Sequence, residues 1–151
     1  MNETEFFNCD RPTIEFATEP PAIVCSIFKF DKSFLDLVRN KLDIIFANEQ
    51  EIMSLIDAKK FEEVVYFGNK LGKLIVITRG EKGSISIFNN EVVECDIKKG
   101  LKIVDLTGAG DLFAAGFLHG YVNNLSMKQS LEKGTEMSSK VIQIFGARLK
   151  S

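Results

Sequence analysis

Apolar positions follow two patterns that alternate along the chain. Unbroken apolar runs are typical of strands that are buried on both faces of a parallel sheet. Runs of this kind predict strands at residues 22–28, 43–48, 73–80 and 101–105. Apolar residues at helical spacing predict helices at 31–42, from 49, at 58–68, at 109–122 and from 126. The alternation indicates a doubly wound α/β fold with a mostly parallel sheet and helices on both faces.

The segment 84–97 (SISIFNNEVVECDI) differs from these runs. Its apolar and polar residues alternate, and the alternation is interrupted at Asn89 and Asn90. Alternation marks a half-exposed sheet, and paired asparagines favour a tight turn, so the segment predicts a β-hairpin. Four or five strands are fewer than a complete doubly wound sheet has, and we expect the fold to be partial.

The two C-terminal helices have different compositions. The helix at 109–122 is apolar nearly all round, which predicts a buried helix pressed closely against the sheet. Its small residues are Ala114, Ala115, Gly116 and Gly120. The last helix opens with Ser126 and Gln129 at capping-box spacing. The apolar face expected for it comprises Leu131, Val141, Ile142 and Phe145.

Composition and charge narrow the class of protein. The chain has 151 residues, of which 45% are hydrophobic and 26% charged, as in an ordinary globular domain. A formal net charge of −2 without a long basic run argues against a nucleic-acid partner. No apolar run approaches the roughly 20 residues that cross a bilayer, and the cysteines are widely spaced. We therefore expect a cytoplasmic protein with neither a nucleic-acid nor a membrane partner.

Residues 1–21 are the least regular part of the chain. All three prolines lie there, at positions 12, 20 and 21. Prolines in a segment without apolar periodicity predict an extended arm or loop. We expect an irregular N-terminal arm over 1–21 and one domain over 22–151.

The residues best suited to chemistry lie in IVDLTGAGDLFAAGF, residues 103–117, where an expected strand gives way to a helix. Gly108 and Gly110 allow backbone torsions and close approaches that other residues do not. Free N–H groups at a helix N-terminus, together with the helix dipole, make a site for an anion. Asp111, in the first turn, would lie beside that anion, where a carboxylate can accept a proton. A tight turn with a favourable helix start has the same pattern, and spacing alone leaves both readings open.

The same residues carry a resemblance to a known family. DLTGAGDLFAAGF resembles the C-terminal signature of the PfkB (ribokinase-like) family of carbohydrate and nucleoside kinases, in its adenosine-kinase-like branch. Leu106 departs from the Thr or Ser that is usual at its position. The resemblance implies a ribokinase-like fold, ATP as phosphoryl donor, and Asp111 as catalytic base. It further implies that Gly108, Ala109 and Gly110 form the anion hole and that Asp105 lies near a monovalent-cation site for K⁺.

Two further segments resemble the family in order and spacing. FANEQE is similar to its N-x-x-E motif, which implies that Asn48 and Glu51 help to hold Mg²⁺ and phosphate. The same two residues also fit a capping box at a helix start. VITRGEKG is similar to its nucleotide-binding strand and turn, which implies that Thr78, Gly80 and Gly83 lie at the ATP site. A strand end with turn glycines is the alternative.

The resemblance extends over residues 22 to 149 but covers only the C-terminal half of the family's fold. Members normally carry an N-terminal half with a β lid and most substrate-binding residues, and residues 1–25 do not resemble it. We therefore expect the C-terminal half of a kinase that acts on a sugar or nucleoside, weak or inactive by itself. Two alternatives stay open. One is a two-chain kinase with a complementing N-terminal half, and the other is a non-catalytic remnant that forms a homodimer through an unpaired sheet edge.

Overall fold

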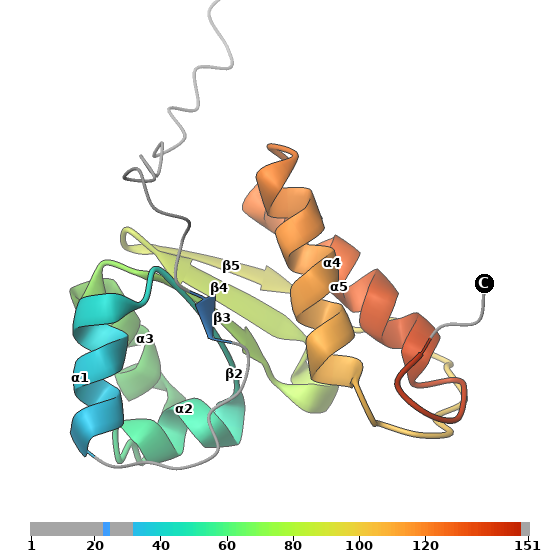
Figure 1. The fold of residues 1–151 in the computed structure, drawn as a ribbon, viewed down its shortest axis with the longest axis horizontal. Coiled ribbons are helices and arrows are strands. Elements are labelled where there is room, and N and C mark those ends of the chain that lie inside the picture. Colours follow the sequence, from blue (N-terminus) through green and yellow to red (C-terminus); the bar gives the residue numbers. More distant parts are fainter. Residues whose placement is uncertain (1–22, 25–31, 149–151) are drawn as a thin grey trace, which may run out of the picture.

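A five-stranded sheet separates two groups of helices (Figure 1). The computed structural model describes residues 23–24 and 32–148, with side chains from residue 35 onward. The strands are β1 (Ile23–Val24), β2 (Ile44–Asn48), β3 (Leu74–Thr78), β4 (Ser84–Phe88) and β5 (Glu91–Cys95). The helices are α1 (Lys32–Lys41), α2 (Glu49–Leu55), α3 (Phe61–Leu71), α4 (Ala109–Val122) and α5 (Met127–Val141), with a 3₁₀ turn, η1 (Gly80–Lys82).

The sheet is mixed, with the strands in chain order β1-β2-β3-β4-β5. β1, β2 and β3 run parallel, whereas β4 and β5 each run antiparallel to the preceding strand. The longer connections, which contain helices, join the parallel strands, and the short η1 connection allows only an antiparallel return. Asn89 and Asn90 both have positive φ, 49° and 63°, as a tight hairpin turn requires. The α/β fold and the hairpin are confirmed, but parallel pairing is confined to the first three strands.

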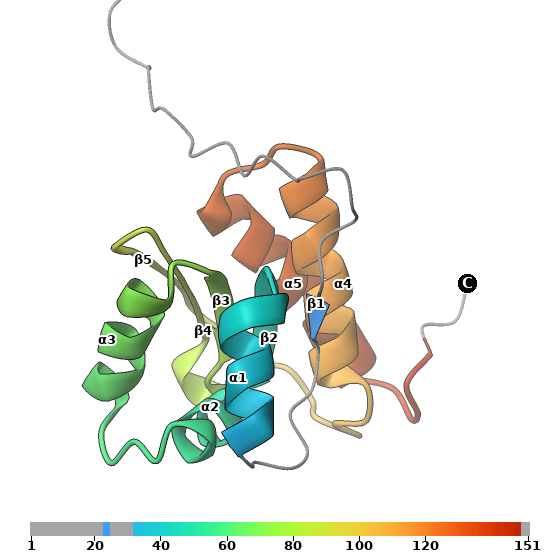
Figure 2. The same ribbon diagram turned by 60° about the vertical axis from the view of Figure 1, so that its left-hand side comes forward.

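Helices cover both faces of the sheet (Figures 1 and 2). On one face, α1, α2 and α3 pack against Ile45, Ala47, Ile75 and Ile77. On the other face, α4 and α5 pack against Ile44, Phe46, Leu74 and Val76. Because both sides of β2 and β3 are buried, every residue of these strands except the last is apolar. This double burial explains the unbroken apolar runs in the sequence. Among the described residues, no helix is both long and apolar enough to cross a membrane.

Helix α4 packs against the sheet as the sequence predicts, but two of its small residues, Gly116 and Gly120, face α5 instead. A Cβ built on Gly116 would lie 2.5 Å from the backbone oxygen of Lys133. On the facing helix, a Cβ on Gly134 would lie 2.8 Å from the backbone oxygen of Phe113. The aromatic residues of α4 make the contact with the sheet, and the Phe117 ring packs edge-on against Phe46 with centroids 5.5 Å apart. The lack of a side chain at Gly116 and at Gly134 thus allows the backbones of α4 and α5 to approach closely.

Two other expectations differ from the structure, and two fall wholly or partly outside the described residues. Residues 101–105 form no strand, because the N–H groups of Val104 and Asp105 both donate to the carbonyl oxygen of Ile142. Ile103 is accordingly 63% exposed. Helix α5 opens with the predicted capping box of Ser126 and Gln129 but ends at Val141, which leaves Phe145 beyond it and 89% exposed. Of the expected strand 22–28, β1 forms one part and residues 22 and 25–28 lie outside the described residues, as does the expected arm 1–21.

The contact between α4 and α5 predicts an unusual result for Gly116→Ala. Alanine normally favours a helix, but here its methyl group would collide with the Lys133 backbone. We expect a loss of unfolding free energy of about 1–3 kcal/mol, typical of overpacking, measured by urea denaturation. The neighbouring Ala115 is exposed, and Ala115→Ser should change that free energy by no more than about 0.5 kcal/mol. Equal stabilities for the two variants would contradict the predicted clash.

Candidate functional site

The candidate site lies where the parallel strands β2 and β3 end. Their last residues, Asn48 and Thr78, are register partners. The carboxyl ends of parallel strands meet at one edge of a sheet, and in α/β proteins this edge is where ligands bind. Helix α4 begins beside it, because Gly108 to Asp111 line the same pocket as Asn48 and Thr78. The ends of β2 and β3 and the start of α4 therefore bring their polar groups to the same edge of the sheet.

A pocket of about 310 Å³ brings together most of the predicted site residues. Those that line it are Asn48, Glu51, Thr78, Gly108, Ala109, Gly110 and Asp111. Three predicted residues, Gly80, Gly83 and Asp105, do not line the pocket. Apolar residues that were not predicted as site residues complete the wall: Phe46, Ala47, Val76, Leu106 and Phe113. Most of them are neighbours of the motif residues along the chain, which is the signal that could have identified them.

The two glycines at the start of α4 differ in their surroundings. Gly108 is the N-cap with φ of 76°, and a Cβ there would lie 2.7 Å from the Cβ of Ala147. Gly110 has open space beside it, because a Cβ there would meet nothing within 4 Å. The N–H of Ala109 donates to the oxygen of Leu106 over 3.2 Å. The N–H groups of Gly110 and Asp111 belong to the first turn, where an α-helix supplies no carbonyl partner. These two N–H groups and the space beside Gly110 suit an anion.

Asp111 lies in the first turn of the 14-residue helix α4 and is exposed at the pocket. Within the described part of the chain, no ion pair or hydrogen bond occupies its carboxylate. A carboxylate that is fixed at its base by a helix but unpaired at its tip can accept a proton from a ligand hydroxyl. The geometry thus permits the role of base that the sequence suggested, and that role stays a prediction.

Asn48 and Glu51 form the capping box that was the alternative reading of their spacing. The N–H of Glu51 donates to Asn48 Oδ1, and the N–H of Asn48 donates to Glu51 Oε2, each over 2.8 Å. Capping uses Oε2 of Glu51, so that Oε1 is not needed for the cap, and the residue lines the pocket. A structural role and a ligand-binding role are therefore compatible in this pair.

An Mg²⁺ ion fits the oxygen donors of the pocket. Mg²⁺ prefers oxygen ligands, retains several waters, and commonly binds through one carboxylate together with substrate phosphates. Glu51 supplies such a carboxylate, next to the N–H groups that suit phosphate. Among the residues that the structure describes, no cluster of three or more acidic, histidine or cysteine side chains could hold a metal alone. A metal at this site would thus depend on phosphate oxygens as well as on Glu51.

Gly80 and Gly83 shape the turn between β3 and β4. Both have positive φ, 58° and 84°, and a Cβ on Gly83 would overlap the backbone oxygen of Cys95. The N–H of Arg79 donates to the oxygen of Gly83 over 2.8 Å and closes the turn. This turn accounts for the glycine at 83 without a ligand, since any side chain there would collide with β5. The nucleotide contacts of Gly80 and Gly83 remain predictions.

Asp105 holds the loop before α4 in place. Its Oδ1 accepts hydrogen bonds from the Thr107 N–H over 2.9 Å and from the Thr107 hydroxyl over 2.7 Å. Its Oδ2 accepts from the N–H of Gly146 over 2.9 Å, which ties the loop to the turn after α5. The bonds from Thr107 and then from Gly146 lower the pKa of Asp105 below its ordinary value. The structure thus gives Asp105 a task in positioning the loop, and its K⁺ role stays a prediction.

The layered α/β architecture, with a pocket where the parallel strands end and a glycine-lined helix start beside it, is that of a ribokinase-like domain. The chain belongs to the pfkB family of carbohydrate kinases, whose family model matches residues 19–151. The family expected from the GAGD, NEQE and TRGEKG segments is thereby confirmed.

Several characterised relatives are similar to this chain over part of their length. Cytidine kinase of Thermococcus kodakarensis is 34% identical over 117 residues, which cover 74% of this chain and 42% of that protein. Ribokinase of Lactococcus lactis is 32% identical over 120 residues, 80% of this chain and 37% of that protein. The chain therefore spans about two fifths of the length of these relatives.

Solved structures agree with this coverage. Adenosine kinase from Sinorhizobium meliloti superposes with a TM-score of 0.75 and 35% identity over 78% of this chain and 36% of that one. Ribokinase of Arabidopsis thaliana, solved in complex with ribose and ATP, gives a TM-score of 0.66 and 30% identity over 72% of this chain and 37% of that one. The chain shares the ribokinase-like α/β fold described above with both structures, and about three quarters of its length superposes on each of them.

The bonds at Asp105 predict a pH-dependent effect of Asp105→Asn. A carboxyl whose pKa is lower in the folded state stabilises the protein above its unfolded pKa, which is about 3.9. The stabilisation is lost as the pH falls through the lowered folded value. Wild type should therefore exceed the variant in unfolding free energy at pH 7, with a gap that narrows below about pH 4. Urea denaturation across this range measures the gap, and Asp96→Asn, on the exposed residue after β5, is the control. A gap that does not change with pH would contradict the prediction.

Proposed function

We propose that this chain provides the nucleotide side and the catalytic base for ATP-dependent phosphoryl transfer to a hydroxyl of a sugar or nucleoside. The observation that carries the proposal is that Asn48, Glu51, Thr78 and Gly108–Asp111 line one pocket, although they come from three segments that lie far apart in the sequence. The relatives support the substrate class, because they include a cytidine kinase, a ribokinase and an adenosine kinase.

In the proposed reaction, the acceptor hydroxyl oxygen attacks the γ-phosphorus of ATP. A new O–P bond forms, the bond from the γ-phosphorus to the bridging oxygen breaks, and ADP leaves. Asp111 accepts the proton of the attacking hydroxyl. The N–H groups of Gly110 and Asp111 donate to the phosphoryl oxygens, where negative charge develops, and the dipole of α4 adds to this stabilisation.

Mg²⁺, when bound, neutralises charge on the transferring phosphates. Glu51 would hold it through the oxygen that the cap does not use, while its other oxygen maintains the cap of α2. Thr78, at the end of β3 and beside Asn48, would contact the nucleotide. We place this activity in the cytoplasm, where ATP is supplied.

The acceptor side of the site is proposed to come from the part of the family fold that this chain does not cover. The chain spans about two fifths of its relatives, and its pocket is lined by nucleotide-side residues and the base. β1 is the outermost strand of the described sheet and pairs only with β2 there, which leaves an edge for further strands. Residues 22–151 would thus be the C-terminal half of a kinase domain. A complementing half is favoured over a homodimer, since a second copy brings no acceptor residues.

Binding of Mg·ADP is the first test of this proposal. Isothermal titration of the full 151-residue chain should give a dissociation constant in the micromolar to millimolar range, as is usual for enzyme substrates. The same chain without a complementing half should transfer little phosphate to a sugar or nucleoside. Absence of Mg·ADP binding would contradict the proposal, and strong transfer by the chain alone would contradict the assignment of the acceptor side.

Alanine at the two glycines should separate ligand binding from folding. Gly110→Ala places a methyl group in open pocket space, so we expect weaker Mg·ADP binding with no loss of unfolding free energy. Gly108→Ala demands a left-handed alanine that also collides with Ala147, and it should lower the unfolding free energy by at least roughly 1–2 kcal/mol. Calorimetric titration and urea denaturation of both variants measure the two effects. Mg·ADP binding by Gly110→Ala at the wild-type affinity would show that the phosphate does not bind beside Gly110.

Asp111→Asn should separate binding from chemistry. The amide keeps the size of the side chain but cannot serve as a base, and the loss of a negative charge beside the phosphates should not weaken Mg·ADP binding. In a preparation with measurable turnover, such as the chain with a complementing half, the rate of phosphoryl transfer should fall by roughly 10²–10⁴-fold. Unchanged turnover would show that Asp111 is not the base.

A further inference from the structure

Glu49 and Arg79 occupy equivalent places on neighbouring strands. Each directly follows a pocket residue, since Glu49 comes after Asn48 and Arg79 after Thr78. Asn48 and Thr78 are register partners at the ends of β2 and β3. The pair therefore lies immediately beyond the strand ends, and neither residue lines the pocket itself.

Glu49 binds two cations from the turn after β3. Arg79 Nε donates to Glu49 Oε2, and Lys82 Nζ donates to Glu49 Oε1, each over 3.1 Å. The Arg79 guanidinium carbon also lies 3.7 Å from the centroid of the Phe61 ring at the start of α3. The cluster of Glu49, Arg79, Lys82 and Phe61 thus joins the starts of α2 and α3 to the turn between β3 and β4. We call it the strand-end cluster.

Burial distinguishes this cluster from an ordinary surface ion pair. The side chains of Arg79 and Glu49 are only 17% and 20% exposed, whereas that of Lys82 is 65% exposed. Partial burial tends to raise the pKa of Glu49, but its bonds to Lys82 and Arg79 outweigh this and leave the pKa lowered. A planar guanidinium that stacks on an aromatic ring while donating to a carboxylate has one preferred orientation. The pair therefore constrains geometry, which exposed pairs seldom do.

We propose that Arg79 is a positioning residue for the nucleotide side of the site. Through Glu49, Arg79 holds the capping box of Asn48 and Glu51 at a constant distance from Thr78, at the pocket that these residues line. The backbone of Arg79 also contributes to this positioning, because its N–H donates to the oxygen of Gly83 and so closes the turn that begins after Thr78. The inference rests on the proposed function for its ligand, but the positioning itself is a property of the chain without ligand.

The test measures amide signals at the end of one strand when the residue that follows the neighbouring strand is changed. Amide signals of Asn48 and Glu51 are recorded by NMR for the unliganded full chain with Arg79→Leu and Arg79→Lys. The amide signal of Thr78 is recorded for the full chain with Glu49→Gln. Each of these cross-pair signals is recorded on the strand end that does not carry the substitution, so that it excludes the chemical-shift changes that any substitution causes at its neighbours in sequence. Mg·ADP is then titrated into every variant at a temperature below its measured unfolding.

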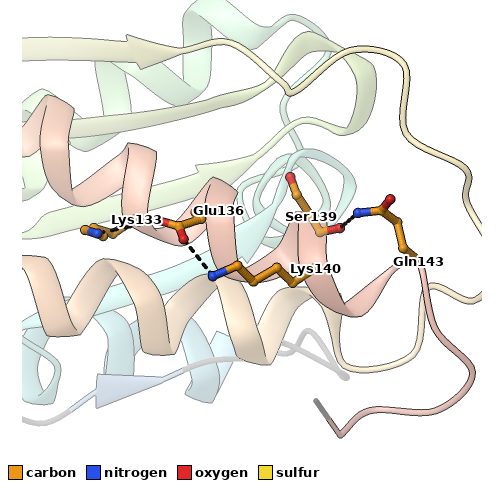
Figure 3. A network of polar contacts seen from close by, with 5 residues as sticks. All are labelled: Lys133, Glu136, Ser139, Lys140 and Gln143. Carbon is orange, nitrogen blue, oxygen red and sulfur yellow. Dashed lines mark hydrogen bonds and ion pairs between the residues drawn. The ribbon is translucent and has the colours of Figure 1, made fainter. Parts of the chain in front are cut away.

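The control is a carboxylate with the same kind of partners far along the chain. Glu136 on α5 binds Lys140 over 2.7 Å and Lys133 over 3.5 Å (Figure 3). None of these three residues lines the pocket. Glu136→Gln thus removes one doubly paired carboxylate, as Glu49→Gln does, without touching the strand ends.

The expected result is a shift of the cross-pair amide signals together with roughly tenfold weaker Mg·ADP binding, the effect typical of residues that orient direct ligand contacts. Arg79→Lys should be intermediate, because it keeps the charge but loses the planar stack. Glu136→Gln should move neither readout. Cross-pair signals and affinity that both stay at wild-type values would overturn the proposal and leave the cluster a stabilising contact only.

Two further outcomes remain decisive. If Arg79→Leu does not fold, Glu49→Gln and Arg79→Lys supply the same cross-pair readings. If wild type does not bind Mg·ADP, the proposed function is contradicted, and the amide signals alone decide whether Arg79 positions the capping box.

Discussion

The structure depends above all on the parallel, in-register pairing of β2 with β3. Each strand ends in one polar residue after four buried apolar ones, so the pairing sets Asn48 and Thr78 side by side. Burial on both faces requires helices on both sides, and the connections through α2 and α3 satisfy this on one face. The other face is then available to α4, whose N-terminus meets the strand ends. Core packing and pocket assembly are therefore consequences of one pairing.

Much of the fold could be predicted because its signals are local. The unbroken apolar runs of β2 and β3, the asparagine turn and the capping box at Ser126 each lie within a few residues. The failures occurred where a distant contact decides the structure. Residues 101–105 are apolar enough for a strand, but the carbonyl of Ile142 takes the N–H groups of Val104 and Asp105. Likewise, the composition of α4 does not reveal that Gly116 and Gly120 face α5 and not the sheet.

The candidate site shows the same division. Most predicted site residues line one pocket, because each motif is attached to the end of a predictable element, but Gly80, Gly83 and Asp105 do not line it. The tie from Asp105 to Gly146 and the cluster around Arg79 span 41 and 30 residues and leave no local pattern. In sequence, Glu49 is an acid at a helix start and Arg79 a turn residue, which are unremarkable positions. The polar residues that line the pocket could therefore be predicted, but these long-range contacts could not.

The loop before α4 is secured by the turn after α5 and not by a strand partner. Asp105 binds Gly146, and Gly108 packs against Ala147. The start of α4 and residues 142–147 therefore share contacts, and any two ligands that acted through those contacts would affect each other reciprocally. Were the pocket to bind phosphate as proposed, a molecule that contacts only this turn would change the phosphate affinity by the same factor by which phosphate changes the affinity for that molecule. Phe145 lies in this turn and is exposed.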